Sequence, residues 1–228
     1  MKQDLSLVGL GLYSPSEAAA LTHIPVKRIR RWLRGHRIGE DNYPALWRSQ
    51  LEKFDIDDGL YLSFLDLVQL RVADAFITEG LSAQKVRRAI EIGTKIVESE
   101  YPFANAKFRT DGKTVILQVL DPEEVQDARL IDLINNQYLM RKVIEPSLKN
   151  LEFDHDVAAR WWPRGQSGGI VIDPKRQFGQ PIDALTGVPT KMLAEAERVD
   201  GEQGAAKRFA VPVGSVKRAV AFEQQLAA

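Results

Sequence analysis

The chain has 228 residues, 44% of them hydrophobic and 27% charged, which is the balance of a soluble globular protein. Its 31 basic and 31 acidic residues cancel, so any affinity for nucleic acid must come from a local patch. The absence of cysteine excludes disulfides and thiolate metal sites. Because the chain also lacks a signal peptide and an apolar run of about 20 residues, we expect a cytoplasmic protein without a membrane span.

Near the N-terminus, the stretch YSPSEAAALTHIPVKRIRRWLRG predicts two short helices around a tight connection. Ser14 and Glu17 form a capping-box pattern, and Pro15 suits the first position of the first helix. The second helix is predicted to begin near Val26 and to end at Gly35.

The second helix of this pair is amphipathic and basic. Ile29, Trp32 and Leu33 fall on one face at helical spacing. No acid occurs from residue 26 to residue 37, and the remaining face is basic: Lys27, Arg28, Arg30, Arg31 and Arg34, with Arg37 just beyond. Such a helix fits the major groove of DNA, where Arg and Lys reach phosphates and guanine edges. The alternative is a solvated helix with excess charge.

The polar segment that follows has a turn candidate at 40–42 and a predicted return strand at 43–47, which together would form a wing. A wing would bring its polar residues near the DNA backbone, whereas a plain surface loop is the alternative for each of them. The complete set of predicted DNA contacts is Ser16, Lys27, Arg28, Arg30, Arg31, Arg34, His36, Arg37, Tyr43 and Arg48.

Two longer helices are predicted next, over 62–79 and from a cap at Ser82 to about residue 98. From SPSEAAALTHIPVKRIRRWLRG to LSFLDLVQLRVADAFITEGLSAQKVRRAIE, the chain resembles MerR-like winged helix-turn-helix domains. Ile29, Arg30 and Trp32 match the aliphatic–Arg–aromatic pattern of the MerR recognition helix, whereas Pro25 and Arg31 depart from it. The resemblance implies binding to duplex operator DNA.

The long heptad helix of MerR activators is missing from this chain, because Tyr101–Pro102 breaks the helical pattern. We therefore do not expect a metal-sensing or drug-sensing activator. Residues 99–169 predict instead a small α+β segment with antiparallel strands. Its predicted elements are strands at 106–110 and 113–119 around an Asp111–Gly112 hairpin turn, strands at 130–134, 151–153, 157–162 and 169–172, and a helix over 137–148.

The aromatic residues Tyr138, Trp161 and Trp162 of this central segment are predicted to fill a core or a subunit contact. A single short recognition helix covers few base pairs, and helix-turn-helix proteins commonly bind two half-sites as dimers. We therefore expect a homodimer, with its contact in the central segment.

The last segment, 170–228, predicts a turn-rich connection and three helical stretches at 190–199, 202–209 and 213–226. From residue 190 onward, six basic residues face five acidic ones, so this end lacks the charge of the basic helix. A protein-docking role and a second DNA reader both remain open. Four cations of this segment are predicted to be exposed and to form a second possible surface for DNA or a partner: Lys207, Arg208, Lys217 and Arg218.

The pattern VIDP-x4-FGQP followed by GVPT resembles a small domain of VapB-type antitoxins. The matching residues are Ile172, Asp173, Pro174, Phe178, Gly179, Pro181, Val188, Pro189 and Thr190. The pairing with a MerR-like front end implies an antitoxin that represses its own operon and neutralises a PIN-domain ribonuclease toxin. The alternative is a stand-alone MerR-like transcriptional regulator. From the residues alone, Asp173 is interpreted as a turn residue and Phe178 as a core aromatic.

We expect neither an enzyme nor a cofactor or metal site. His155 lies between Asp154 and Asp156, but no further ligand occurs at a recognisable spacing. No nucleophile elbow or paired-carboxylate constellation stands out. The expected fold class is α+β and mainly helical, in three segments: a winged helix-turn-helix over 1–98, the central segment over 99–169, and a helix-turn-helix-like three-helix bundle over 170–228.

Overall fold

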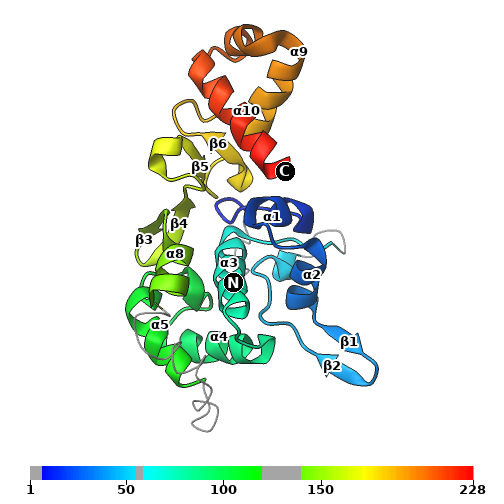
Figure 1. The fold of residues 1–228 in the computed structure, drawn as a ribbon, viewed down its shortest axis with the longest axis vertical. Helices are drawn as coiled ribbons and strands as arrows, with labels where there is room; N and C mark the ends of the chain where they lie inside the picture. Colours follow the sequence, from blue (N-terminus) through cyan, green and yellow to red (C-terminus); the bar gives the residue numbers. More distant parts are fainter. Residues whose placement is uncertain (1–6, 55–58, 120–139, 228) are drawn as a thin grey trace, which may run out of the picture. The chain divides into compact units, whose positions relative to one another are not determined.

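The computed structural model of the protein describes residues 7–54, 59–119 and 140–227 (Figure 1). The chain forms two compact units. We call them the helical unit, made of Ser14–Lys149 and Phe153–Ala158, and the sheet unit, made of Met1–Tyr13, Asn150–Glu152 and Ala159–Ala228. Within the described residues, helices dominate and the strands are antiparallel, which makes the fold α+β as expected.

The described helices and strands of the helical unit follow one another as helix, helix, hairpin and then helices. They are α1 (Pro15–Thr22), α2 (Val26–Arg34), β1 (His36–Ile38), β2 (Asp41–Tyr43), η1 (Glu52–Phe54), α3 (Phe64–Thr78), α4 (Ala83–Val97), η2 (Pro102–Ala104), α5 (Phe108–Leu117), a π-helical turn (Met140–Ile144) and α8 (Glu145–Leu148).

The start of α1 has the capping box that the sequence predicts. The side chain of Ser14 accepts from the backbone N–H of Glu17, whose carboxylate accepts in return from the backbone N–H of Ser14. The same arrangement begins α3, where Ser63 and Asp66 cap each other, and Ser82 caps α4 as predicted. Caps of this kind satisfy backbone donors that a helix cannot pair internally, so these boundaries are set locally.

The core of the helical unit is built around α3, which is buried over most of its circumference. Phe76 of α3 meets Phe103 and Phe108, with ring centroids 5.5 and 6.2 Å away. All three rings are fully buried. Aromatic packing of this extent explains why the short elements after α4 are fixed against α3.

The predicted hairpin around Asp111–Gly112 is wrong, because this stretch forms α5. Phe108, Val115 and Ile116 are buried at a spacing of seven and eight residues, which is helical. A Cβ at Gly112 would lie 2.9 Å from Ile144 and 3.1 Å from Phe108. Gly112 is therefore a close-packing position within a helix and not a turn residue.

The predicted strand at 130–134 and the predicted contact residue Tyr138 lie outside the described residues. The predicted helix over 137–148 is described only from Met140, as the π-helical turn that leads into α8. Pro146 lies near the beginning of α8, where its missing N–H costs no hydrogen bond.

Four short strands form one sheet in the order β3 (Leu151–Asp154), β4 (Val157–Trp161), β5 (Ile170–Ile172) and β6 (Pro181–Asp183). The first three match the predicted strands at 151–153, 157–162 and 169–172. The strand β6 was not predicted, because its sequence begins with Pro181 and lies within a turn-rich stretch. It pairs with β5 in antiparallel register, Val171 opposite Ile182.

Trp161, one of the predicted dimer contacts, is only 5% exposed and fills the interior of its own chain. Trp162 is partly buried, and its indole N–H donates to Glu152 over 2.8 Å. Trp161 therefore serves packing within the chain, and Trp162 is held in place by Glu152.

The last two described elements are the helices α9 (Thr190–Phe209) and α10 (Val213–Ala227). Gly201, at φ 70° and ψ 171°, divides α9 into two arms, so the three predicted helical stretches fall on these two arms and α10. Small and aliphatic residues pack between them, among them Leu193, Ala205, Val216 and Ala219. Small side chains at this interface let the helices approach closely.

Candidate nucleic-acid interface

The helix α2 separates its apolar and basic residues as the sequence predicts. Ile29, Trp32 and Leu33 are buried. The opposite surface is exposed and basic over Lys27, Arg28, Arg30, Arg31 and Arg34, and Ser16 of α1 is exposed as well. This segregation leaves a row of cations on one helix that is held from behind by its apolar face.

Arg28 differs from the other cations of α2. Its guanidinium lies 2.9 Å from Asp74 of α3 and 5.8 Å from the ring centroid of Trp32. The pair is partly exposed and contributes little stability. Its main effect is to fix the orientation of α2 against α3, and it partly neutralises Arg28 as a contact for phosphate.

Directly after α2, the chain makes the tight antiparallel hairpin β1–β2 (Figure 1). Gly35 joins the two, at φ 71° and ψ −177°, and a Cβ there would lie 2.5 Å from the carbonyl oxygen of Tyr43. Only glycine adopts this conformation without strain and leaves this space. Gly35 therefore places the hairpin next to the basic helix.

The hairpin differs in detail from the predicted wing. Its turn falls at residues 39–40 and not at 40–42, and β2 ends at Tyr43. The predicted strand over 43–47 is wrong, since Leu46 and Trp47 are consecutive and both buried, which an alternating strand does not allow. Leu46 instead donates its backbone N–H to the carbonyl of Trp32 over 2.7 Å.

His36 and Tyr43 face each other across the hairpin, and their rings stack with centroids 4.8 Å apart. Desolvation, together with the positive charge of Arg31, lowers the pKa of His36. The imidazole is therefore neutral at pH 7 and adds no cation to the surface. Arg37 on the same strand is exposed.

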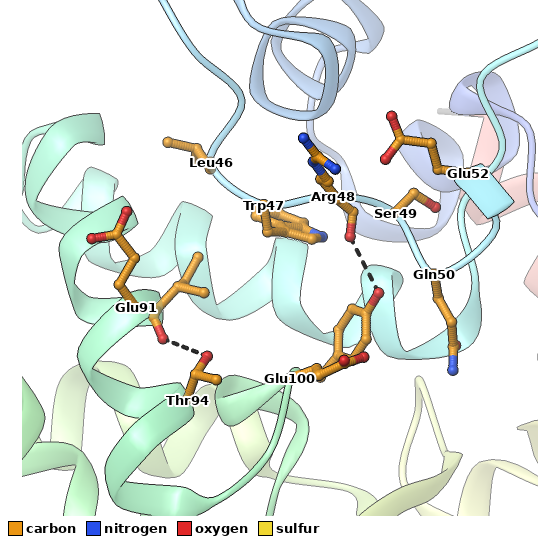
Figure 2. A pocket seen from close by; sticks show the side chains of 11 residues that line it. Leu46, Trp47, Arg48, Ser49, Gln50, Glu52, Glu91, Thr94 and Glu100 are labelled. Carbon is orange, nitrogen blue, oxygen red and sulfur yellow. Dashed lines mark hydrogen bonds between the residues drawn. The ribbon is translucent and has the colours of Figure 1, made fainter.

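Arg48, the last predicted DNA contact, lies elsewhere in the helical unit. It lines an open pocket of about 650 Å³ together with Glu52, Glu91 and Glu100 (Figure 2). Burial and the nearby carboxylates, Glu100 and Glu52 among them, raise the pKa of Tyr101 in the same pocket. A phosphate near Arg48 would meet this negative charge, so we leave Arg48 out of the proposed contact surface.

A buried carboxylate fixes the segment that returns from the hairpin. Asp66 of α3 is fully buried and accepts from the indole N–H of Trp47 at 2.9 Å and from the hydroxyl of Ser49 at 2.8 Å. It also accepts from the backbone N–H groups of Ser63 and Gln50. Burial raises the pKa of Asp66, although these hydrogen bonds oppose the shift.

These contacts of Asp66 were not predicted from the sequence. Arg87 of α4 adds to them by donating to the carbonyl of Ala45 over 2.9 Å and to that of Pro44. The Ser63–Asp66 cap was the only local signal for them. Together these contacts tie the segment after the hairpin to α3 and α4.

The second predicted cationic surface is largely neutralised by acids of the sheet unit. Arg208 pairs with Asp200 at 3.2 Å, and Lys217 pairs with Glu202 at 3.3 Å. Lys207, on α9, is exposed. These helices therefore present far less net positive charge than α2.

Arg218, predicted as exposed, is partly exposed, and its guanidinium reaches a buried acid of the sheet unit. Its guanidinium donates twice to Asp183, over 2.6 and 3.1 Å, and once to Ser215. Asp183 is fully buried, which opposes its ionisation, but hydrogen bonds from Arg218, Thr186 and Ser215 outweigh burial and lower its pKa. Arg218 is thus the partner of a buried carboxylate, and its charge is offset within the sheet unit.

The structure confirms the interpretation of Asp173 as a turn residue and contradicts that of Phe178 as a core aromatic. Asp173 is buried, accepts from the backbone N–H of Lys175 and pairs with Arg160, as suits a turn residue. Phe178 is 57% exposed, so its interpretation as a core aromatic is wrong.

Within the described part of the chain, no group of three His, Cys, Asp or Glu side chains could hold a metal ion. His155 is exposed and lies 3.7 Å from Asp154. Across the same residues, no helix is both long and apolar enough to cross a bilayer.

The chain is similar to one known protein in sequence and to a solved structure in fold. The chain is 25% identical over 198 residues to a protein of Mycobacterium tuberculosis named "Putative antitoxin VapB45", and the match covers 82% of each chain. Its fold is similar to the crystal structure of Rv2018 from Mycobacterium tuberculosis, with a TM-score of 0.65 at 20% identity, over 96% of this chain and all of that one. No protein-family description matches the sequence.

Proposed function

We propose that this protein is the antitoxin of a toxin–antitoxin pair, and that it binds operator DNA through α2 and the hairpin β1–β2. The relative named as an antitoxin, matched over 82% of both chains, supports the antitoxin role. The observation that carries the DNA-binding role is the exposed basic face of α2, backed by a buried apolar face and followed by a hairpin.

The proposed DNA surface consists of cations that converge from one helix and one strand. Lys27, Arg30, Arg31 and Arg34 are exposed on α2, and Arg37 is exposed on β1. A helix of nine residues inserts one or two turns into a major groove, where such side chains reach phosphates and base edges. Autorepression follows if this DNA lies upstream of the protein's own gene.

We propose that the partner is a ribonuclease of the PIN-domain class and that the sheet unit binds it. Support comes from the charge of α9 and α10, three of whose cations are paired with acids of their own unit. A surface of balanced charge is better suited to binding a protein than to binding a polyanion such as DNA. We also propose that the protein binds its operator as a homodimer, since two half-sites give one short helix enough specificity.

The test combines two assays on the purified full-length chain. A labelled fragment from upstream of the gene should be shifted at concentrations that leave an unrelated fragment of equal length free. The purified nuclease encoded by the adjacent gene should cleave RNA alone and lose that activity when the chain is added at equal concentration.

The two assays separate the candidate functions. A shift of the upstream fragment without inhibition of the nuclease would indicate a stand-alone regulator. Inhibition without any specific shift would contradict the role of α2. If the chain neither shifted the fragment nor inhibited the nuclease, the proposed function as a whole would be contradicted.

A further inference from the structure

The loop between β5 and β6 presents a large aromatic side chain to solvent. Phe178 lies in this loop, at 57% exposure. Its sequence neighbours Lys175 and Arg176 are exposed as well. An exposed aromatic is common by itself, so its significance depends on how the loop holds it.

The loop is held firmly on both sides of Phe178. The backbone N–H of Leu12 donates to the carbonyl of Phe178 over 2.9 Å, and the hydroxyl of Tyr13 donates to the carbonyl of Gly179 over 2.8 Å. A Cβ at Gly179 would come within 2.2 Å of that hydroxyl. At the loop's beginning, buried Asp173 is fixed as described above. Phe178 is therefore displayed by an ordered loop.

The backbone at this point is strained. Gln177 and Phe178 have φ angles of 47° and 53°, in the left-handed region that residues with a Cβ avoid. Asparagine or glycine would occupy this conformation at lower cost, and a bulky aromatic is an uncommon choice. Residues in such conformations are held by the surrounding structure and cluster at functional sites.

The apolar side chains that the sheet unit exposes favour a protein as its partner. Of the seven large apolar side chains exposed among the described residues, two (Ile38 and Val157) belong to the helical unit and five to the sheet unit: Val8, Phe178, Leu185, Met192 and Val199. Apolar exposure together with paired charges is typical of a protein interface. The flanking cations Lys175 and Arg176 add a positive rim.

We propose that Phe178 is the anchor by which the sheet unit binds its protein partner, entering an apolar pocket that carboxylates surround. The inference rests on the proposed function in taking this partner to be the toxin. A single aromatic that enters a pocket and is flanked by charges has the features of an interface hot spot. The positive rim from Lys175 and Arg176 matches an acidic edge on the partner.

Two substitutions separate a binding role from a structural one. Phe178→Asn removes the aromatic ring but suits the left-handed backbone, so the variant should fold and have a higher melting temperature than the wild type. Gln177→Asn relieves the same kind of strain at the neighbouring position and keeps the ring. Both should therefore be stabilised, and only Phe178→Asn should bind the partner less well.

The measurement is calorimetric titration of the full-length chain into the purified nuclease of the adjacent gene, with DNA binding and oligomeric state measured in parallel. We expect Phe178→Asn to lose at least about tenfold in affinity for the nuclease, and Gln177→Asn to stay within about twofold. Both variants should shift the upstream DNA like the wild type and keep its mass in light scattering.

Several outcomes would overturn the inference. Equal affinity of wild type and Phe178→Asn for the nuclease would do so and would leave the antitoxin function intact. A selective loss of DNA binding would show that the ring contacts nucleic acid, and a changed mass would show that it joins two copies of this chain. If wild-type protein does not bind the nuclease, both the inference and the proposed function fail.

Discussion

Two helix pairs in this chain look similar in sequence and differ in how their charges are used. In α1–α2, the cations Arg30 and Arg31 are exposed opposite a buried apolar face, and Arg28 pairs with Asp74 of the neighbouring helix α3. In α9–α10, by contrast, acids of the same unit pair with three of the four predicted cations.

The comparison teaches that a count of cations does not identify a DNA-binding helix. What matters is where the nearest acids lie in the fold. The ion pair of Arg218 and Asp183 joins positions 35 residues apart, so no local sequence pattern predicts it. On α2 the sequence excludes acids within the helix for more than two turns, but it does not predict the pair that Arg28 forms with Asp74 of α3.

The largest effect expected from this difference concerns DNA affinity. Replacing Arg30 and Arg31 together with alanine should weaken binding to the upstream fragment at least about 30-fold, because each such contact contributes about 1–3 kcal/mol. The matched control replaces Lys207 and Lys217, which removes the same charge from the other pair and should change the affinity less than about twofold. Filter binding or fluorescence anisotropy measures both.

A crossed pair of single substitutions should sharpen the comparison. Arg218→Ala leaves the carboxylate of Asp183 buried without its cation, so the free energy of unfolding should fall by about 2 kcal/mol, an estimate reduced because Arg218 is 37% exposed. Arg31→Ala should leave stability unchanged. Urea unfolding measures both, and a stable Arg218→Ala with weakened DNA binding would contradict the assignment.

How much of this could be predicted from the sequence depends on the range of the interactions involved. The capping box of Ser14 and Glu17 and the amphipathic helix α2 are local, and both were predicted within a residue. Gly112 was misread because the Asp–Gly pair is a strong turn signal, whereas its packing against Ile144 is a distant contact.

The exposure of Phe178 could not be predicted for the same reason. The loop that displays it is held by Tyr13, whose hydroxyl bonds to Gly179 across 166 positions of the chain. An aromatic within an apolar pattern is usually buried, and only the tertiary contact reverses that expectation. The hydrogen bonds that Asp66 accepts from the segment after the hairpin were not predicted, because the donors lie in a loop and the acceptor lies on a helix later in the sequence.

The two buried carboxylates should respond to pH in opposite directions. The pKa of Asp183 is lowered, so its stabilising effect is complete above the unfolded value of about 3.9 and is lost as pH falls through the folded value. The pKa of Asp66 is raised, so its effect is complete below the unfolded value and is lost as pH rises through the folded value.

Unfolding free energies between pH 3 and pH 7 check this contrast. The deficit of Asp183→Asn relative to wild type should narrow as pH falls, and the deficit of Asp66→Asn should narrow as pH rises. The slopes should not exceed about 1.4 kcal/mol per pH unit for one proton. Parallel trends in the two variants would show that the environments of the carboxylates are not as described.

The smallest effect is expected at His36. Because its pKa is lowered, the ring is neutral at pH 7 and contributes no counterion release. The affinity for DNA should therefore change less than about twofold from pH 7.5 to pH 6.5, and His36→Gln should behave like the wild type. A gain of fivefold or more over this range that His36→Gln abolishes would place a protonated imidazole on the DNA.

The most direct test of the central claim, that α2 and not the C-terminal helix pair contacts DNA, is the salt dependence of binding to the upstream fragment. We expect the affinity of the wild type to fall steeply with salt, and the log–log slope to be shallower by up to about 1.8 when Arg30 and Arg31 are alanine, since each lost phosphate contact removes about 0.9. The slope of the variant lacking Lys207 and Lys217 should equal that of the wild type. A shallower slope only in that second variant, or a wild-type affinity insensitive to salt, would contradict the account.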